Sequence, residues 1–172
     1  MILPVQLRFV HLSTKTMPQA NSSKVNYVEA DTKVQTNALL SQTNATPGLA
    51  RISHKAAGNS TYVFDSTSGA GITAYIVDTG ILATHSEFEG RATFGANFAN
   101  TVDTDENGHG SHVAGTIGGR TFGVAKSVTL VGVKVLDANG AGSNSQSIQG
   151  LQFGMIHIPF IRKAILIQNS HE

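Results

Sequence analysis

The sequence predicts an α/β fold with an open, doubly wound parallel sheet. Two β-prone runs, residues 71–77 and 128–135, are apolar on both faces, as is typical of parallel strands covered by helices. Helix-compatible segments lie between and after them, at 112–117 and 146–153, so strands and helices alternate. Functional groups in such sheets gather at the carboxyl ends of the strands, which makes Asp78, directly after the first run, a candidate.

The elements of this body follow one another with clear boundary signals. Asp78-Thr79-Gly80 provides turn chemistry after the first strand. The first helix is rich in small residues and is entered through Gly108 and Gly110. After the second strand, Asn139-Gly140 predicts a turn, and Ser143 or Ser145 is suited to cap the second helix.

Composition indicates one globular domain. The chain has 172 residues, 40% of them hydrophobic and 13% charged, which is enough for a single core. With a net charge of +1 and no basic run, we expect no binding to nucleic acid or to a membrane surface. The sequence contains no stretch of 18 apolar residues, so we predict no membrane span. The lack of cysteine excludes disulfides and thiolate chemistry.

Four stretches differ in character along the chain. Residues 1–23 are assigned to no domain and are expected to be disordered. Pro4 and Arg8 interrupt their apolar start, which makes it a poor signal peptide. Residues 24–40 contain an alternating, strand-like run at 25–30. Residues 41–153 form the α/β body. From residue 154 to 172 the pattern changes, and Pro159 is expected to break any continuing helix.

The glycine-flanked loop before the first helix carries two histidines, His109 and His112. They could share a metal, but the zinc motif H-E-x-x-H is not met, because the spacing is one residue short and the glutamate is missing. Solvated or core histidines are the ordinary alternative. Residues 103–108 match the start of a calcium loop, but its twelfth position is Ala114 instead of a glutamate. We therefore predict no metal site and interpret 103–108 as a polar surface loop.

Asp78 and His109 are a candidate catalytic pair. A hydroxyl nucleophile needs a base to take its proton, and a histidine base needs an anion that fixes its tautomer and stabilises its charged form. An aspartate that ends a buried strand and a histidine at a helix entrance suit these roles. Their separation in sequence does not by itself bring them together, and a structural aspartate at a strand-to-turn corner is the common alternative.

The sequences around both residues resemble motifs of the subtilisin-like serine proteases. Residues 74–81, Ala-Tyr-Ile-Val-Asp-Thr-Gly-Ile, resemble the aspartate motif, and residues 107–116, Asn-Gly-His-Gly-Ser-His-Val-Ala-Gly-Thr, resemble the histidine motif. Further segments resemble the fungal, secreted proteinase K subfamily: 48–52, 62–65, 85–92, 123–126 and 133–137. The resemblance runs from residue 41 to 153, less than half of such a catalytic domain. Residues 24–40 resemble the last strand of its inhibitory propeptide.

This resemblance implies a partial subtilisin-like sheet, truncated after the His-motif helix and the strand and helix that follow. It implies that Asp78 orients and charge-stabilises the base and that His109 is the base. Gly140, Ala141 and Gly142 would form the edge strand that binds the substrate backbone by strand addition. The implied protein is an extracellular, monomeric serine endopeptidase that acts on protein or peptide substrates. It would need no cofactor, although the full-length family domain can bind calcium.

Two family features are missing from the sequence. The family nucleophile lies in Gly-Thr-Ser-Met-Ala, which does not occur here, and the available serines lack its surroundings: Ser111, Ser143, Ser145 and Ser147. The family oxyanion donor is an asparagine in Ala-Gly-Asn between the histidine and the serine, whereas Ala57-Gly58-Asn59 precedes Asp78. Residues 154–172 resemble nothing in the family and are interpreted as an aberrant tail.

We therefore expect a truncated peptidase chain that is inactive in this form. One alternative is a non-catalytic fragment or pseudo-enzyme that binds a full-length protease, which the strand-like run at 25–30 motivates. Another is a metal hydrolase that uses His109, His112 and nearby acidic residues.

Overall fold

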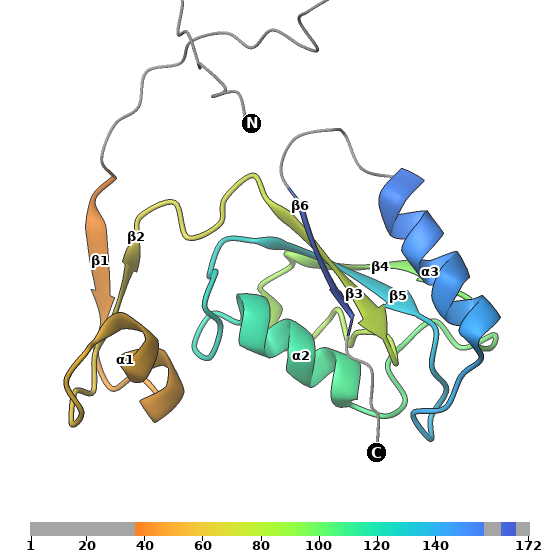
Figure 1. The fold of residues 1–172 in the computed structure, drawn as a ribbon, viewed down its shortest axis with the longest axis horizontal. Coiled ribbons are helices and arrows are strands. Elements are labelled where there is room, and N and C mark those ends of the chain that lie inside the picture. The colour runs from red at the N-terminus through yellow and green to blue at the C-terminus, as the bar shows by residue number, and fades with distance from the viewer. Residues whose placement is uncertain (1–36, 157–162, 168–172) are drawn as a thin grey trace, which may run out of the picture. The chain divides into compact units, whose positions relative to one another are not determined.

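The computed structural model describes residues 37–156 and the backbone of 163–167. Four parallel strands form the main sheet in the order β4-β5-β3-β6 (Figure 1). They are β3 (Thr73–Asp78), β4 (Ala92–Asn97), β5 (Thr129–Lys134) and β6 (Lys163–Ile167). The predicted α/β fold with a parallel sheet is confirmed. The strand-like run at 25–30 lies outside the described residues.

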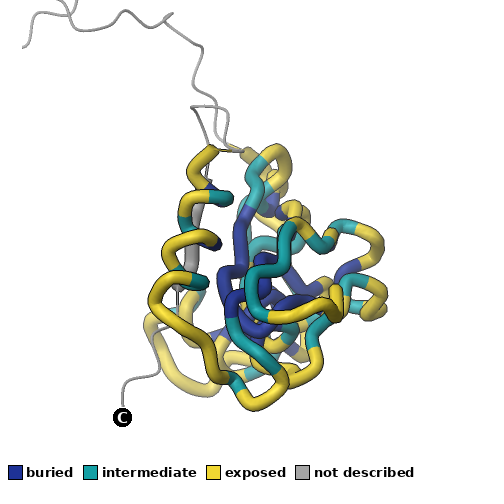
Figure 2. The backbone as a smooth tube through the Cα atoms, turned by 90° about the vertical axis from the view of Figure 1, so that its right-hand side faces the viewer, coloured by how far each residue is buried: buried dark blue, intermediate teal, exposed yellow. Residues whose placement is uncertain are grey.

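Helices α2 (His109–Gly118) and α3 (Asn144–Ile156) cover opposite faces of this sheet. Successive side chains of a strand point to opposite faces, so each strand divides its residues between two cores. Ala74 and Ile76 of β3 pack with Val113 and Ala114 of α2. Tyr75 and Val77, which alternate with them, pack with Val133 and with Phe153 of α3. Figure 2 shows the buried backbone gathered inside the body, with exposed residues along the helix surfaces and loops.

Both helices are longer than the sequence indicated. Helix α2 begins at His109, three residues before the predicted start, and α3 begins at Asn144. The expected serine cap of α3 is present as a reciprocal pair: Ser143 Oγ accepts from Gln146 N at 3.3 Å, and Ser143 N donates to Gln146 Oε1 at 2.6 Å. This pattern is the capping box. No helix in the described part of the chain is long and apolar enough to cross a membrane.

A small N-terminal lobe contains β1 (Leu39–Gln42), α1 (Pro47–Ser53) and β2 (Tyr62–Asp65), with β1 and β2 paired antiparallel. Tyr62 is buried with Ala45 and Leu49 in a core of its own. Its hydroxyl donates to Val124 O at 2.9 Å, and Lys126 Nζ lies 5.4 Å from its ring centroid. These contacts join the lobe to the loop after α2. The 3₁₀ turn η2 (Ser86–Phe88) follows β3.

The C-terminal part of the chain differs from the expectation. Helix α3 continues to Ile156, past the boundary placed at Phe153, and β6 then adds a fourth parallel strand beside β3. The fold therefore does not stop at the helix after the second strand. Helix α3 ends before Pro159, as expected of a helix-breaking proline. Residues 164–167, Ala-Ile-Leu-Ile, are β-prone, and pairing with β3 satisfies the backbone groups on one side of β6.

Candidate active site

Asp78 lies at the carboxyl end of β3, on the face that α2 covers. The alternation that points Ala74 and Ile76 toward α2 carries Asp78 to the same side. Its side chain is 3% exposed, and Thr79 N donates to its Oδ1 at 2.6 Å. A buried carboxylate without partners would be costly, so its orientation depends on the groups that donate to it.

His109 is the first residue of α2, and the fold brings it to Asp78. Its Nδ1 lies 2.8 Å from Asp78 Oδ1 and 2.9 Å from Oδ2. Since a carboxylate only accepts hydrogen bonds, this contact places the proton on Nδ1 and leaves Nε2 of the neutral ring as an acceptor. The side chain of His109 is 44% exposed, so the ring links a buried anion to solvent.

Gly110 permits this approach of helix and strand. A Cβ atom at this position would lie 2.1 Å from Gly80 O and 3.2 Å from Asp78 Oδ1. Gly108, the residue before the helix, has φ +100°, a conformation that favours glycine. Of the two glycines that predicted a helix entrance, Gly110 therefore allows the helix to approach the strand closely, and Gly108 provides the left-handed turn before the helix.

The first N–H groups of α2 are satisfied by side chains from three different residues. His109 N donates to Asn107 Oδ1 at 3.2 Å, Gly110 N to Thr79 Oγ1 at 2.9 Å, and Ser111 N to Asp105 Oδ2 at 2.9 Å. Helix starts leave these donors without partners inside the helix. Because Thr79 follows Asp78, one of these bonds ties the histidine helix to the aspartate strand.

Asp105 is a site residue that sequence reasoning missed. Besides Ser111 N, its carboxylate accepts from Thr79 Oγ1 at 2.8 Å, Ser111 Oγ at 2.6 Å and Gly108 N at 2.9 Å. Burial raises the pKa of the Asp105 carboxyl, but the hydrogen bonds from Ser111, Gly108 and Thr79 outweigh it and hold the pKa below its ordinary value. The signal available in the sequence was an acidic residue shortly before a helix start, within the segment interpreted as a surface loop.

The predicted substrate edge at residues 140–142 is not a strand. Asp137 organises the segment instead: its N–H donates to Ala141 O at 2.9 Å, and its Oδ1 accepts from Ala141 N at 3.0 Å. Both backbone groups of Ala141, which lies between Gly140 and Gly142, are therefore bonded within this loop. The loop adjoins the histidine entrance, since Asn107 Nδ2 donates to Ala138 O at 2.9 Å.

The other candidates of the sequence analysis lie in different surroundings. Ser111 Oγ donates to Asp105 and accepts from Leu82 N at 2.9 Å, while Ser143 and Ser145 bond each other at 2.9 Å. Asn59 lies in the exposed loop between α1 and β2, where its amide donates to Ala56 O. Among the described residues, no three His, Asp or Glu side chains are arranged to hold a metal ion.

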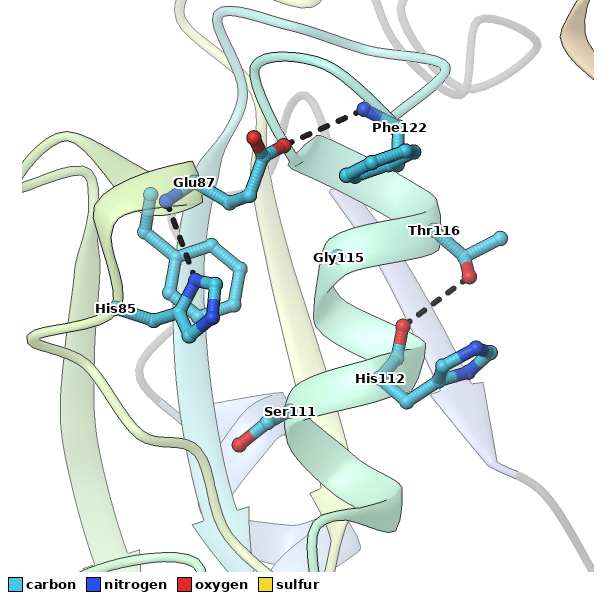
Figure 3. Close-up of a pocket in the computed structure, with 8 residues that line it drawn as sticks. His85, Glu87, Ser111, His112, Gly115, Thr116 and Phe122 are labelled. Atoms are coloured by element: carbon cyan, nitrogen blue, oxygen red, sulfur yellow. Dashed lines mark hydrogen bonds between the residues drawn. The ribbon is translucent and has the colours of Figure 1, made fainter. Parts of the chain in front are cut away.

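His112 lines a separate hollow of about 380 Å³ between η2 and the outer face of α2 (Figure 3). His85 and Glu87 form the opposite wall, and Phe122 closes one end. Burial raises the pKa of the Glu87 carboxyl, but hydrogen bonds from Thr121 and Phe122 and the charge of Arg120 outweigh this effect and hold the pKa below its ordinary value. Asp78 and His109 do not line this hollow.

Comparisons with known proteins agree on one family. The model of the subtilase family, peptidase S8, matches residues 69–169. Subtilisin-like protease 2 of Pseudogymnoascus destructans is 58% identical over 135 residues, which cover 78% of this chain and 34% of that protein. Subtilisin-like protease 7 of Arthroderma otae is 56% identical over 135 residues, with the same two coverages. The chain thus spans about a third of the length of these relatives.

A solved structure agrees with the sequence comparison. The crystal structure of a cold-adapted subtilisin-like serine proteinase superposes with a TM-score of 0.64 and 40% sequence identity. The superposition covers 68% of this chain and 44% of that one.

Proposed function

This chain belongs to the subtilase family, and we propose that its Asp78–His109 pair is the general base of a serine endopeptidase. The observation that carries the proposal is the contact of His109 Nδ1 with both carboxylate oxygens of Asp78, at 2.8 and 2.9 Å. In the proposed role, Nε2 of His109 takes the proton of a serine hydroxyl as the hydroxyl attacks the peptide carbonyl. Asp78 holds the ring in the correct tautomer and stabilises the imidazolium that forms.

We propose further that the 172-residue chain does not hydrolyse peptides by itself. The Gly-Thr-Ser-Met-Ala motif is absent from its sequence. Ser111, the serine nearest to His109 in sequence, has its hydroxyl engaged by Asp105 and by Leu82 N. A nucleophile must instead donate its proton to the base, so Ser111 is unsuited to that role.

The substrate would bind along residues 140–142, where it would complete the strand that is lacking in the unbound loop. Ala141 N and O are both bonded to Asp137, and Gly140 N donates to Asp137 O at 3.0 Å. The proposed pairing groups of this segment are therefore Gly140 O and the backbone groups of Gly142, to which an extended peptide would add as a strand. The proposed substrates are proteins or peptides, and the resemblance to secreted fungal proteases supports an extracellular location.

A hybrid protein tests the role of the pair. In the hybrid, residues 41–153 of this chain replace the matching segment of the Pseudogymnoascus destructans relative, and the remainder of the hybrid is the relative's sequence. We expect the hybrid to cleave casein, and His109→Ala to lower kcat by about a million-fold. That magnitude belongs to subtilisin, itself a subtilase, and is taken over from it. His54→Gln, in the N-terminal lobe, is the matched control and should retain activity.

The isolated chain provides the second arm of the test. A fluorophosphonate probe that labels activated serines should leave the 172-residue chain unmodified and label the hybrid stoichiometrically. Labelling of the isolated chain would show an activated serine that the proposal denies. Full activity of the His109→Ala hybrid would remove His109 from the role of base.

A further inference from the structure

Lys134 is a fully buried cation that the proposed mechanism does not use. It ends β5 with 0% of its surface exposed. Its Nζ donates to Thr79 O at 2.7 Å and lies 3.5 Å from Glu106 Oε2, a side chain that is 28% exposed. Burying an ammonium group is costly unless it is paired and hydrogen-bonded, so this position calls for a physical reason.

The register of the sheet places Lys134 directly beside Asp78. The two residues are paired at the carboxyl ends of the neighbouring parallel strands β5 and β3. Both continue the row of side chains that faces α2, since Leu130 and Ile76 belong to the core under that helix. A buried cation and a buried carboxylate therefore end adjacent strands on the same face.

Lys134 acts on the same residue that orients the carboxylate. Thr79 N donates to Asp78 Oδ1 at 2.6 Å, and its Oγ1 accepts from Gly110 N and donates to Asp105. The bond from Lys134 Nζ to Thr79 O fixes the remaining polar group of this residue. With N, O and Oγ1 all bonded, the side chain of Thr79 and the peptide groups on both sides of it are held in place.

The charge of Lys134 also matches its surroundings. Asp78 and Asp105 both accept a hydrogen bond from Thr79, and Glu106 Oε2 lies 3.5 Å from the Lys134 Nζ that binds Thr79 O. Acidic groups this close together repel one another, and the repulsion matters most for Asp78, which is the buried one of the three. The buried ammonium group of Lys134, bonded to Thr79 O and close to Glu106, offsets this repulsion.

We propose that Lys134 is a positioning residue for the Asp78–His109 pair, acting through the Thr79 carbonyl and through its buried charge. This inference rests on the proposed function of the pair. It predicts that the contact between Asp78 and His109 depends on a cation at position 134, even though Lys134 touches neither the ring nor a substrate.

Proton NMR of the full 172-residue chain, labelled with ¹⁵N-histidine, tests this inference without any need for activity. A proton held between an imidazole Nδ1 and a carboxylate resonates at low field, and Asp78→Asn should abolish the His109 signal in that region. Lys134→Met should abolish or broaden the same signal, whereas Lys134→Arg, which keeps the charge, should retain it. Lys126→Met is the matched control, because Lys126 also donates to backbone carbonyls, those of Arg120, Thr121 and Gly123. It should leave the signal in place.

The outcomes separate the two ideas. Retention of the wild-type signal in folded Lys134→Met would overturn the positioning role alone. Retention in Asp78→Asn would overturn the Asp78–His109 pair and the inference with it. If Lys134→Met loses its cooperative urea transition, the double variant Asp78→Asn/Lys134→Met tests whether the loss comes from the uncompensated charge of Asp78. Recovery of the transition supports charge compensation, and the absence of any recovery overturns it.

Discussion

Gly110 decides whether the histidine helix can approach the aspartate strand. The space that a methyl group would need is occupied by the backbone of Gly80, at 2.1 Å, and not by a flexible side chain. Because backbone cannot yield without moving β3, relief of this clash would separate α2 from Asp78. Gly115, in the same helix, has no atom within 4 Å of its hypothetical Cβ.

This contrast predicts opposite effects for two identical substitutions. Gly110→Ala should destabilise the chain by about 1–3 kcal/mol through overpacking. Gly115→Ala should be neutral or should stabilise it by up to about 1 kcal/mol, because alanine favours helices. Urea unfolding followed by circular dichroism measures both. Equal effects of the two substitutions would contradict the close approach at Gly110.

The lowered pKa of Asp105 gives stability a dependence on pH. A carboxyl whose pKa is lower in the folded state stabilises that state above its unfolded pKa, near 4, and loses this contribution as the pH falls through the folded value. Asp105→Asn should therefore lower the melting temperature at pH 7 and lose less stability than wild type between about pH 5 and pH 3. Asp103→Asn, an equal charge change in an exposed residue, is the control. Parallel pH curves for wild type and Asp105→Asn would contradict the prediction.

At the level of single residues, the sequence singled out Asp78 and His109, which the structure brings into contact, and missed the residues that support them. Asp78 and His109 stand within long motifs whose letters are distinctive. Asp105 and Lys134 act through contacts between distant segments, with Thr79 as their common partner. A lone lysine at the end of an apolar strand, or a lone aspartate in a polar loop, has no pattern that reveals such a partner.

The elements show where local patterns are sufficient. Strands β3 and β5 were predictable because residues apolar on both faces suit a sheet covered on both sides. The start of α2 was placed too late, because its first N–H groups are satisfied by Thr79, Asp105 and Asn107 and not by a recognisable local cap. The segment 140–142, expected to be an edge strand, is irregular and follows a turn at 138–139, because Asp137 binds the backbone of Ala141.

Strand β6 was missed because it is short and follows a proline, yet it completes one side of β3. A chain that ends at residue 162 should therefore exchange the amide protons of β3 faster, since that edge loses its partner. Pairing of β4 with β5 does not involve β6, so their amides serve as the internal control. Hydrogen exchange with mass spectrometry measures both. Unchanged exchange in β3 would contradict the pairing.

At the level of the whole molecule, the site belongs to the sheet and not to any one segment. Asp78 comes from β3, His109 from α2, Lys134 from β5 and the glycine edge from the loop that leads to α3. Pairing of β3 with β5 sets Lys134 beside Asp78, and packing of α2 on the sheet brings His109 to the same end, where open α/β folds generally hold their functional groups. The N-terminal lobe contributes none of them, and it meets the body through Tyr62 and Lys126.

The strand order β4-β5-β3-β6 determines when β3 can find its partners while the chain is being synthesised on the ribosome. Both partners of β3 follow it in the sequence, and β6 begins at Lys163, long after β3 ends at Asp78. At translation rates of about 5–20 residues per second, β3 leaves the ribosome several seconds before β6 exists. During that interval an apolar strand presents unpaired N–H and C=O groups, which favours association with other nascent chains. Slower synthesis or fewer chaperones should therefore reduce the yield of soluble chain, although the stability of the chain once folded is unchanged.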